Sequence, residues 1–168
     1  MYVFTSICYS LFNMYYITFI TVGKQKNGSC KNLVMEYQKR LKLFVKLQTI
    51  EIAETPFSSE RDRNRVLAQE AEKIIKVIPH QSLVITLDAK GKEFDSPAFA
   101  KKIEEWSKQG VHHLTFLLGG PLGLHDTFKK ENVFSLSQLT FPHDLAHVLF
   151  LEQLYRAMTI LKGKTYHY

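Results

Sequence analysis

A chain of 168 residues with 45% apolar and 12% aromatic residues is long enough to bury a core, and this composition excludes a disordered or fibrous protein. Lysine and arginine outnumber aspartate and glutamate by 22 to 16, and the net charge of +6 fits either an anionic partner such as nucleic acid or lipid, or simply a soluble basic protein. Two isolated cysteines, Cys8 and Cys30, exclude a disulfide framework and a cysteine metal cluster and favour a reducing compartment.

The opening residues form one uncharged run. The first 23 residues contain no Asp, Glu, Lys or Arg, which is long enough for a membrane-spanning helix. A secretory signal would begin with basic residues and end at a small-residue cleavage site, and this run shows neither feature. Its last part, Tyr16–Val22 (YITFITV), is rich in β-branched and aromatic residues, which is typical of a buried strand.

Met14 stands directly before this predicted strand, where a coding start is expected. We therefore interpret residues 1–13 as an extra segment from a misassigned start, and residues 14–168 as one cytoplasmic domain that is not bound to a membrane. A protein tethered to a membrane through residues 1–22 is the alternative.

The rest of the chain alternates predicted helices and strands. Apolar residues at helical spacing predict helices over residues 29–44, 59–78, from 96 through 106, and 143–161, with a short helix around 126–132. Alternating or continuous apolar runs predict strands over residues 45–53, 82–88, 112–118 and 133–137. Residues 90–95 (KGKEFD) are interpreted as a loop, with Ser96 as the helix cap and Pro97 as the first helical residue.

Repeated strand–helix units predict an α/β fold with a largely parallel sheet and helices on both faces. Ligands bind such sheets beyond the carboxyl ends of the strands, so the chemistry is expected just after Leu87, Leu118 and Ser137.

Three segments at these strand ends carry candidate residues. Asp88, in TLDAKGK, is suited either to a ribose hydroxyl or to capping a turn. The glycines of LLGGPLGLHD allow backbone amides to approach a ligand, but their spacing matches neither the dinucleotide fingerprint nor the P-loop, so a simple turn explains them equally well. His143 and His147 lie one helical turn apart, but no third ligand accompanies them, so we reject a metal site and expect both to face solvent.

The sequence shows no nucleophile in a recognisable setting. It contains no G-x-S-x-G elbow, and neither cysteine has catalytic surroundings. An enzyme built on this chain would therefore need a cofactor that brings the reactive group.

Five segments together carry a family resemblance. ITFITVGK, TLDAKGK, LLGGPLGL, LSQLTFPHDLAHVLFLEQLYRA and the closing KGKTYHY stand in the order of one bacterial family. The chain resembles the RlmH-type (YbeA-like) ribosomal RNA large subunit methyltransferases of the SPOUT class, over residues 14–168.

The resemblance implies a SPOUT fold whose C-terminal part forms a trefoil knot, with S-adenosyl-methionine bound among the knotted loops. The knot comes from the resemblance alone, since general topology rules argue against one. Carried over to this sequence, the cofactor-binding residues are Leu87, Gly120, Leu136, Ser137, Gln138, Leu139, Thr140 and Phe141.

The family methylates N3 of a pseudouridine in large-subunit ribosomal RNA on assembled ribosomes, and it works as a homodimer whose site is completed across the interface. Catalytic candidates are Arg156 to steady an oxyanion or a phosphate, Tyr166 to stack on a base and His167 to take or relay the N3 proton. A salt bridge to Glu152 is the alternative for Arg156. The whole-protein alternatives are a non-catalytic basic RNA-binding protein on this fold and a SPOUT methyltransferase of tRNA.

Three features depart from the family pattern. Residues 1–13 have no counterpart, His147 stands where the family usually carries arginine, and the chain ends at Tyr168 where relatives often end on a basic residue. The last two differences are expected to weaken contacts with RNA.

Overall fold

The computed structural model describes residues 14–164 of the chain. Its centre is one five-stranded sheet with the order β2-β1-β4-β3-β5, in which every neighbouring pair runs parallel. The predicted parallel α/β architecture is therefore confirmed. The strands are β1 (Tyr15–Val22), β2 (Val45–Ile52), β3 (Leu83–Glu93), β4 (His113–Leu118) and β5 (Val133–Ser135).

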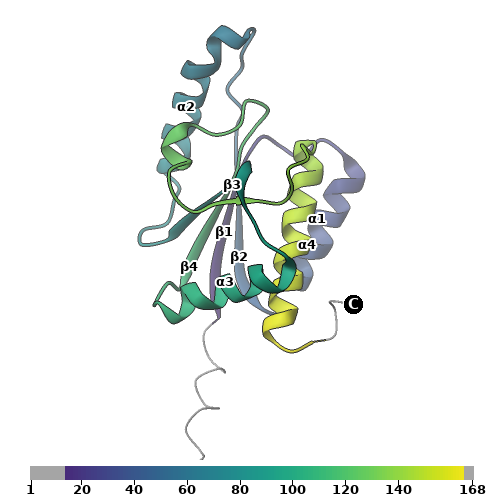
Figure 1. The fold of residues 1–168 in the computed structure, drawn as a ribbon. Coiled ribbons are helices and arrows are strands. Elements are labelled where there is room, and N and C mark those ends of the chain that lie inside the picture. Colours follow the sequence, from purple (N-terminus) through teal and green to yellow (C-terminus); the bar gives the residue numbers. More distant parts are fainter. Residues whose placement is uncertain (1–13, 165–168) are drawn as a thin grey trace, which may run out of the picture.

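The helices cover the two faces of the sheet unequally. Apolar side chains of α1, α3 and α4 form a large core with Ile17 and Phe19 of β1, while α2 packs over Ile20 and Val22, which point to the other face. Figure 1 shows α1 and α4 side by side, with α2 across the sheet from them. Their bounds are α1 (Gly28–Leu41), α2 (Arg63–Ile75), α3 (Ser96–Lys108) and α4 (His143–Leu161).

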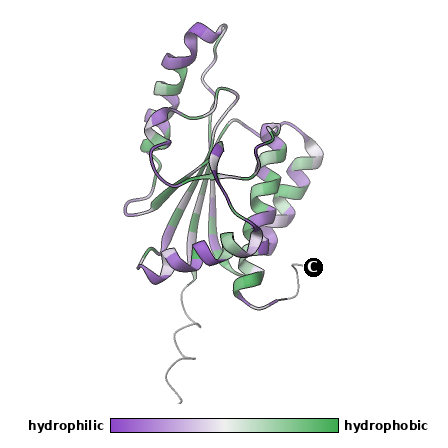
Figure 2. Ribbon diagram, in the orientation of Figure 1, coloured by the Kyte–Doolittle hydropathy of each residue, from purple (hydrophilic) through white to green (hydrophobic). Residues whose placement is uncertain are grey.

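The composition of each helix matches the depth at which it lies. Figure 2 shows α4 as the more apolar helix and α2 as the more hydrophilic one. α4 buries Phe150, Leu151 and Leu154 completely between α1, α3 and the sheet. α2 instead covers two small clusters, one around Ile74 and one formed by its Val66 and Leu67 with Leu122. None of the helices in residues 14–164 is long and apolar enough to cross a membrane.

The N-cap predicted for α3 is wrong. The N-cap is Asp95 rather than Ser96: its side-chain oxygen accepts the Ala98 N–H at 2.7 Å, while the Ser96 hydroxyl donates to Gln153 at 2.8 Å. A carboxylate one residue earlier satisfies the open N–H groups of the first turn, which frees the serine to bind α4.

The predicted loop over residues 90–95 is largely strand. β3 continues to Glu93 and pairs with β5 on both sides of a register shift between Leu87 and Lys92. A Cβ on Gly91 would lie 2.7 Å from the backbone carbon of Val133, so only glycine allows this close approach. The pairing with β5 overrides a lysine- and glycine-rich sequence that by itself indicates a loop.

Short helical segments also differ from prediction. The helix expected from residue 59 begins as a 3-10 turn, η2 (Glu60–Asp62), before α2, and the helix expected around 126–132 is only the 3-10 turn η3 (Asp126–Phe128). These differences lie at element ends, where sequence patterns fix boundaries least well.

Candidate functional site

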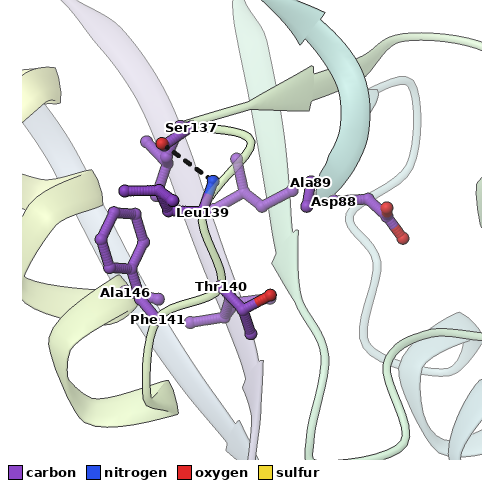
Figure 3. A pocket seen from close by; sticks show the side chains of 10 residues that line it. Asp88, Ala89, Ser137, Leu139, Thr140, Phe141 and Ala146 are labelled. Atoms are coloured by element: carbon purple, nitrogen blue, oxygen red, sulfur yellow. Dashed lines mark hydrogen bonds between the residues drawn. The ribbon is translucent and has the colours of Figure 1, made fainter.

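One pocket lies at the carboxyl edge of the sheet, where the sequence analysis placed the chemistry. It has a volume of about 150 Å³ and is formed by the ends of β3 and β4, the segment after β5 and the first turn of α4 (Figure 3). Six of the eight predicted cofactor residues line it, namely Leu87, Leu136, Ser137, Leu139, Thr140 and Phe141. The other lining residues are Asp88, Ala89, Leu118 and Ala146.

The segment after β5, residues 136–141, leaves its backbone open. The Leu139 N–H donates to the Ser137 hydroxyl oxygen at 3.1 Å, as the dashed line in Figure 3 marks. Apart from this bond, the backbone groups of residues 137–141 form no hydrogen bond with any described residue. Leu139 is 70% exposed although it is a large apolar side chain. An apolar surface beside unused backbone donors and acceptors is the chemistry of a small-molecule site.

The glycine-rich loop after β4, residues 119–124, is closed on itself. A Cβ on Gly119 would lie 2.6 Å from the backbone carbon of Gly123, and the Gly123 N–H donates to the Gly120 carbonyl at 2.9 Å. The Arg63 guanidinium also donates to the Leu122 carbonyl at 2.8 Å. These glycines therefore allow a tight turn, and Gly120 is not among the residues that line the pocket.

Asp88 lies at the pocket edge but is already engaged. Its carboxylate pairs with the Lys129 ammonium at 3.0 Å and accepts the Lys90 N–H at 3.0 Å, and Figure 3 shows it pointing away from Phe141. Burial acts to raise the pKa of Asp88, but Lys90 and Lys129 outweigh it and hold the pKa below 3.8. Of the two roles predicted for Asp88, the structure therefore shows the capping of a turn. The carboxylate stays charged at neutral pH.

The prediction that both histidines face solvent is wrong. His147 is 1% exposed and packs edge-on against Phe19, with ring centroids 4.8 Å apart, because this side of α4 faces the core. Burial lowers the pKa of His147 to about 4, so its ring is neutral. His143 is half-buried, and its Nδ1 lies 3.1 Å from the Gly119 carbonyl, to which it donates.

The part of the chain that the structure describes contains no cluster of metal-binding side chains. No three His, Cys, Asp or Glu side chains gather there in a ligating arrangement. Neither ring nitrogen of His147 contacts a polar partner within these residues.

The remaining predicted site residues do not line the pocket or lie outside the described residues. Gln138 is exposed, and its amide donates to Glu93 at 3.4 Å. Arg156 donates to Glu152 through Nε at 3.1 Å and Nη2 at 2.7 Å. Arg156 follows Ala146 by ten residues on α4, roughly 15 Å along the helix axis, so it does not line the pocket of its own chain. Tyr166 and His167 lie outside the described residues.

Sequence reasoning missed two pocket residues, Ala89 and Ala146, and did not assign a binding role to Leu118. The strand-end rule marked the position of Leu118 and could have included its side chain. No sequence signal distinguishes Ala146 from any other small residue on the buried side of α4.

Comparison with known proteins assigns the chain to a family. It matches the family model described as "Predicted SPOUT methyltransferase" over residues 15–167. A protein of Methanococcus maripaludis is 42% identical over 156 residues, which is 90% of this chain and 98% of its own length. The "Ribosomal RNA large subunit methyltransferase H" of Desulfitobacterium hafniense is 40% identical over 159 residues (92% of this chain, 99% of its own). The protein of that name from Streptococcus pneumoniae is 40% identical over 156 residues (90% and 98%). The chain therefore belongs to the SPOUT methyltransferase family, as its resemblance implied.

Proposed function

We propose that this methyltransferase transfers the methyl group of S-adenosyl-methionine to N3 of a pseudouridine in large-subunit ribosomal RNA, on the assembled ribosome. The open backbone of residues 137–141 beside the apolar pocket wall carries the proposal. The names of the relatives from D. hafniense and S. pneumoniae support ribosomal RNA as the substrate, and the net charge of +6 suits it.

The residues of the pocket fit this cofactor. Leu87, Leu139 and Phe141 offer apolar surface to an adenine ring. Apart from the Leu139 N–H, which donates to Ser137, the N–H and C=O groups of residues 137–141 bond no described residue and are free to meet the donors and acceptors on the edge of that ring. Gly120 and Gln138 stay part of the proposed cofactor set. When bound, the cofactor supplies a methyl group that its sulfonium has already activated. The task of the chain is then to hold the acceptor base in line and remove a proton.

We assign the catalytic roles to residues near the end of the chain. Arg156 steadies the developing charge or a phosphate, Tyr166 stacks on a base and His167 accepts or relays the N3 proton. Arg156 does not line the pocket of its own chain, so this assignment requires a second copy to bring the arginine to the site. A homodimer that completes the site, and the trefoil knot that the resemblance implies, are parts of the same proposal.

Transfer of radiolabelled methyl groups tests the proposed function. Intact ribosomes, free ribosomal RNA and tRNA, all from cells that lack the endogenous activity, are each incubated with the protein and labelled S-adenosyl-methionine. We expect label only in the large-subunit RNA of intact ribosomes, at N3 of a pseudouridine on nucleoside analysis. Label in tRNA would favour the tRNA alternative. RNA binding without cofactor binding or label would favour the non-catalytic alternative.

Equilibrium sedimentation and single variants test the proposed roles. We expect a homodimer, and a loss of turnover of at least about a hundredfold for His167→Ala at unchanged cofactor affinity, because a general base contributes about this much. A monomer with full activity would exclude the shared site.

A further inference from the structure

A second cavity lies at the edge of the sheet, between β3, β5 and α3. Its volume of about 270 Å³ exceeds that of the cofactor pocket, and the two share no lining residue. The side chains that carry its chemistry are Lys92, Phe94, Lys102, Trp106 and Asn132. Neither the family assignment nor the proposed methyl transfer uses this cavity.

Two aromatic rings in this cavity each lie beneath a lysine ammonium. The Lys92 Nζ is 5.0 Å from the centre of the Phe94 ring, and the Lys102 Nζ is 5.6 Å from the centre of the Trp106 ring. Lys92 forms no ion pair with a described residue, and Lys102 has only a half-exposed pair with Glu105 at 3.4 Å. The cavity thus brings two aromatic side chains and two cations together within one small volume, which suits an aromatic base that carries a phosphate.

Asn132 adds a hydrogen-bonding group at the same place. Its backbone adopts the left-handed conformation with φ of 50°, and its carbonyl accepts the Thr86 N–H at 3.0 Å, which fixes the residue at the start of β5. Its side-chain amide is exposed and forms no hydrogen bond with a described residue. An amide carries both donors and an acceptor, so it can bind the edge of a base.

We propose that this cavity binds one nucleotide of the RNA substrate, at a position flanking the nucleotide that is methylated. The proposal rests on the proposed function for its RNA partner. Ala89 lines the cofactor pocket, and Lys92 lines this cavity three residues further along the chain, with Phe94 just past the end of β3. Leu87 of the cofactor pocket and Lys92 of this cavity are both register partners of Phe134 on β5, so the two sites are close neighbours that one RNA strand can reach together.

Trp106 provides a direct readout because it is the only tryptophan in the chain. The full-length protein is titrated with a single-stranded hexauridylate while Trp106 fluorescence is followed, and inorganic phosphate and uridine monophosphate are run as separate probes. We expect hexauridylate to quench Trp106 saturably, and uridine monophosphate to do so more weakly. Quenching by phosphate at the same strength as the oligonucleotide would reduce the cavity to an anion site and overturn the proposal.

Substitutions in and beside the cavity separate specific binding from general charge. We expect Lys92→Ala and Lys102→Ala each to weaken hexauridylate binding about tenfold. Each should also reduce the slope of the logarithm of the binding constant against the logarithm of the salt concentration by about one. Lys101→Ala is the matched control, because Lys101 is an exposed lysine on α3 that does not line the cavity. If Lys101→Ala weakens binding as much as Lys92→Ala does, or if no variant changes it, the proposal fails.

Cofactor affinity, measured by calorimetry on the same variants, distinguishes failure of this proposal from failure of the proposed function. We expect the affinity for S-adenosyl-methionine to be unchanged in Lys92→Ala and Lys102→Ala. A protein that binds and uses the cofactor on ribosomes, yet shows no quenching by hexauridylate, would overturn only the nucleotide cavity. A protein that binds no cofactor, but whose Trp106 is quenched by hexauridylate as expected, would overturn only the proposed methyl transfer.

Discussion

Two segments leave the same edge of the sheet on either side of β3, and they are built in opposite ways. The glycine-rich loop after β4 (residues 119–124) is closed by its own backbone hydrogen bond and by the Arg63 guanidinium, and it buries Leu122 and Leu124. The segment after β5 (residues 136–141) has one internal side-chain contact and leaves Leu139 exposed.

The comparison shows that distinctive residue types, such as glycines, do not mark the segment whose backbone is left open. Glycines attract attention in a sequence because they let a ligand approach the backbone, but here Gly119 accommodates Gly123 instead. The plain sequence of residues 136–141 holds the unused backbone groups. We therefore expect the closed loop (residues 119–124) to govern stability and, under the proposed function, the open segment (residues 136–141) to govern ligand affinity. Substitutions in the two should then act on different measurements.

The largest effect is expected from Gly119→Ala, which breaks the closed loop. Its Cβ would lie 2.6 Å from the backbone carbon of Gly123, which is closer than a real Cβ contact allows. We expect a loss of about 4 kcal/mol in the free energy of unfolding, measured by urea denaturation. Gly28→Ala is the matched control, since nothing lies within 4 Å of its Cβ, and its effect should stay below about 1 kcal/mol. Equal effects of the two substitutions would show that the loop is not sterically closed.

Acidification is expected to loosen the start of α4, which holds the closed loop through His143 and the Gly119 carbonyl. Burial lowers the pKa of His147 from 6.5 to about 4, so the unfolded chain takes up the proton at a higher pH than the fold does. Stability from this group is therefore full above pH 6.5, falls as the pH drops toward 4, and changes no further below that. The pKa difference corresponds to about 3 kcal/mol.

Urea denaturation at pH 7, 6, 5 and 4 measures this loss. We expect His147→Leu to reduce the slope of stability against pH between 6.5 and 4, since leucine cannot take up a proton. His113, whose pKa burial also lowers, should keep a smaller slope in this range. The same slope in the parent protein and in His147→Leu would mean that other groups cause it.

A smaller effect is expected from Arg63→Ala, which removes the side-chain hydrogen bond to the closed loop. The guanidinium donates to the Leu122 carbonyl at 2.8 Å, and its loss leaves that acceptor poorly satisfied. We expect a loss of about 2 kcal/mol in the free energy of unfolding. Arg65→Ala is the control, because among residues 14–164 Arg65 pairs only with Asp62 and Gln69, on the surface. This substitution should cost about 0.5 kcal/mol or less. An equal loss of stability for Arg65→Ala would mean that removing a positive charge from α2 causes the effect, and not the loss of the hydrogen bond to Leu122.

The same contrast explains which features sequence reasoning could predict. Local periodicity gave the strands and helices, and the strand-end rule placed the site beyond Leu87 and Leu118, because both depend on nearby residues. The individual cofactor residues that we propose came from family resemblance, since a segment proposed to bind through its backbone has no distinctive residue types. The continuation of β3 past Asp88 and the burial of His147 depend on β5 and on Phe19, which are distant in sequence.

The smallest expected change in stability, and the clearest test of the open segment, comes from Leu139→Ala. Because Leu139 is 70% exposed, its truncation should change the free energy of unfolding by less than about 0.5 kcal/mol. If residues 136–141 hold the cofactor, the loss of this apolar surface should raise the dissociation constant for S-adenosyl-methionine about five- to tenfold in calorimetry, which corresponds to about 1 kcal/mol. Leu43→Ala is the matched control, since Leu43 is 78% exposed and does not line the pocket.

Unchanged affinity in Leu139→Ala would remove this side chain from the cofactor site. A large loss of stability would instead show that residues 136–141 are as closed as the loop after β4. Reduced affinity at unchanged stability would separate the two segments by function, because the exposed leucine then stabilises the bound ligand rather than the fold.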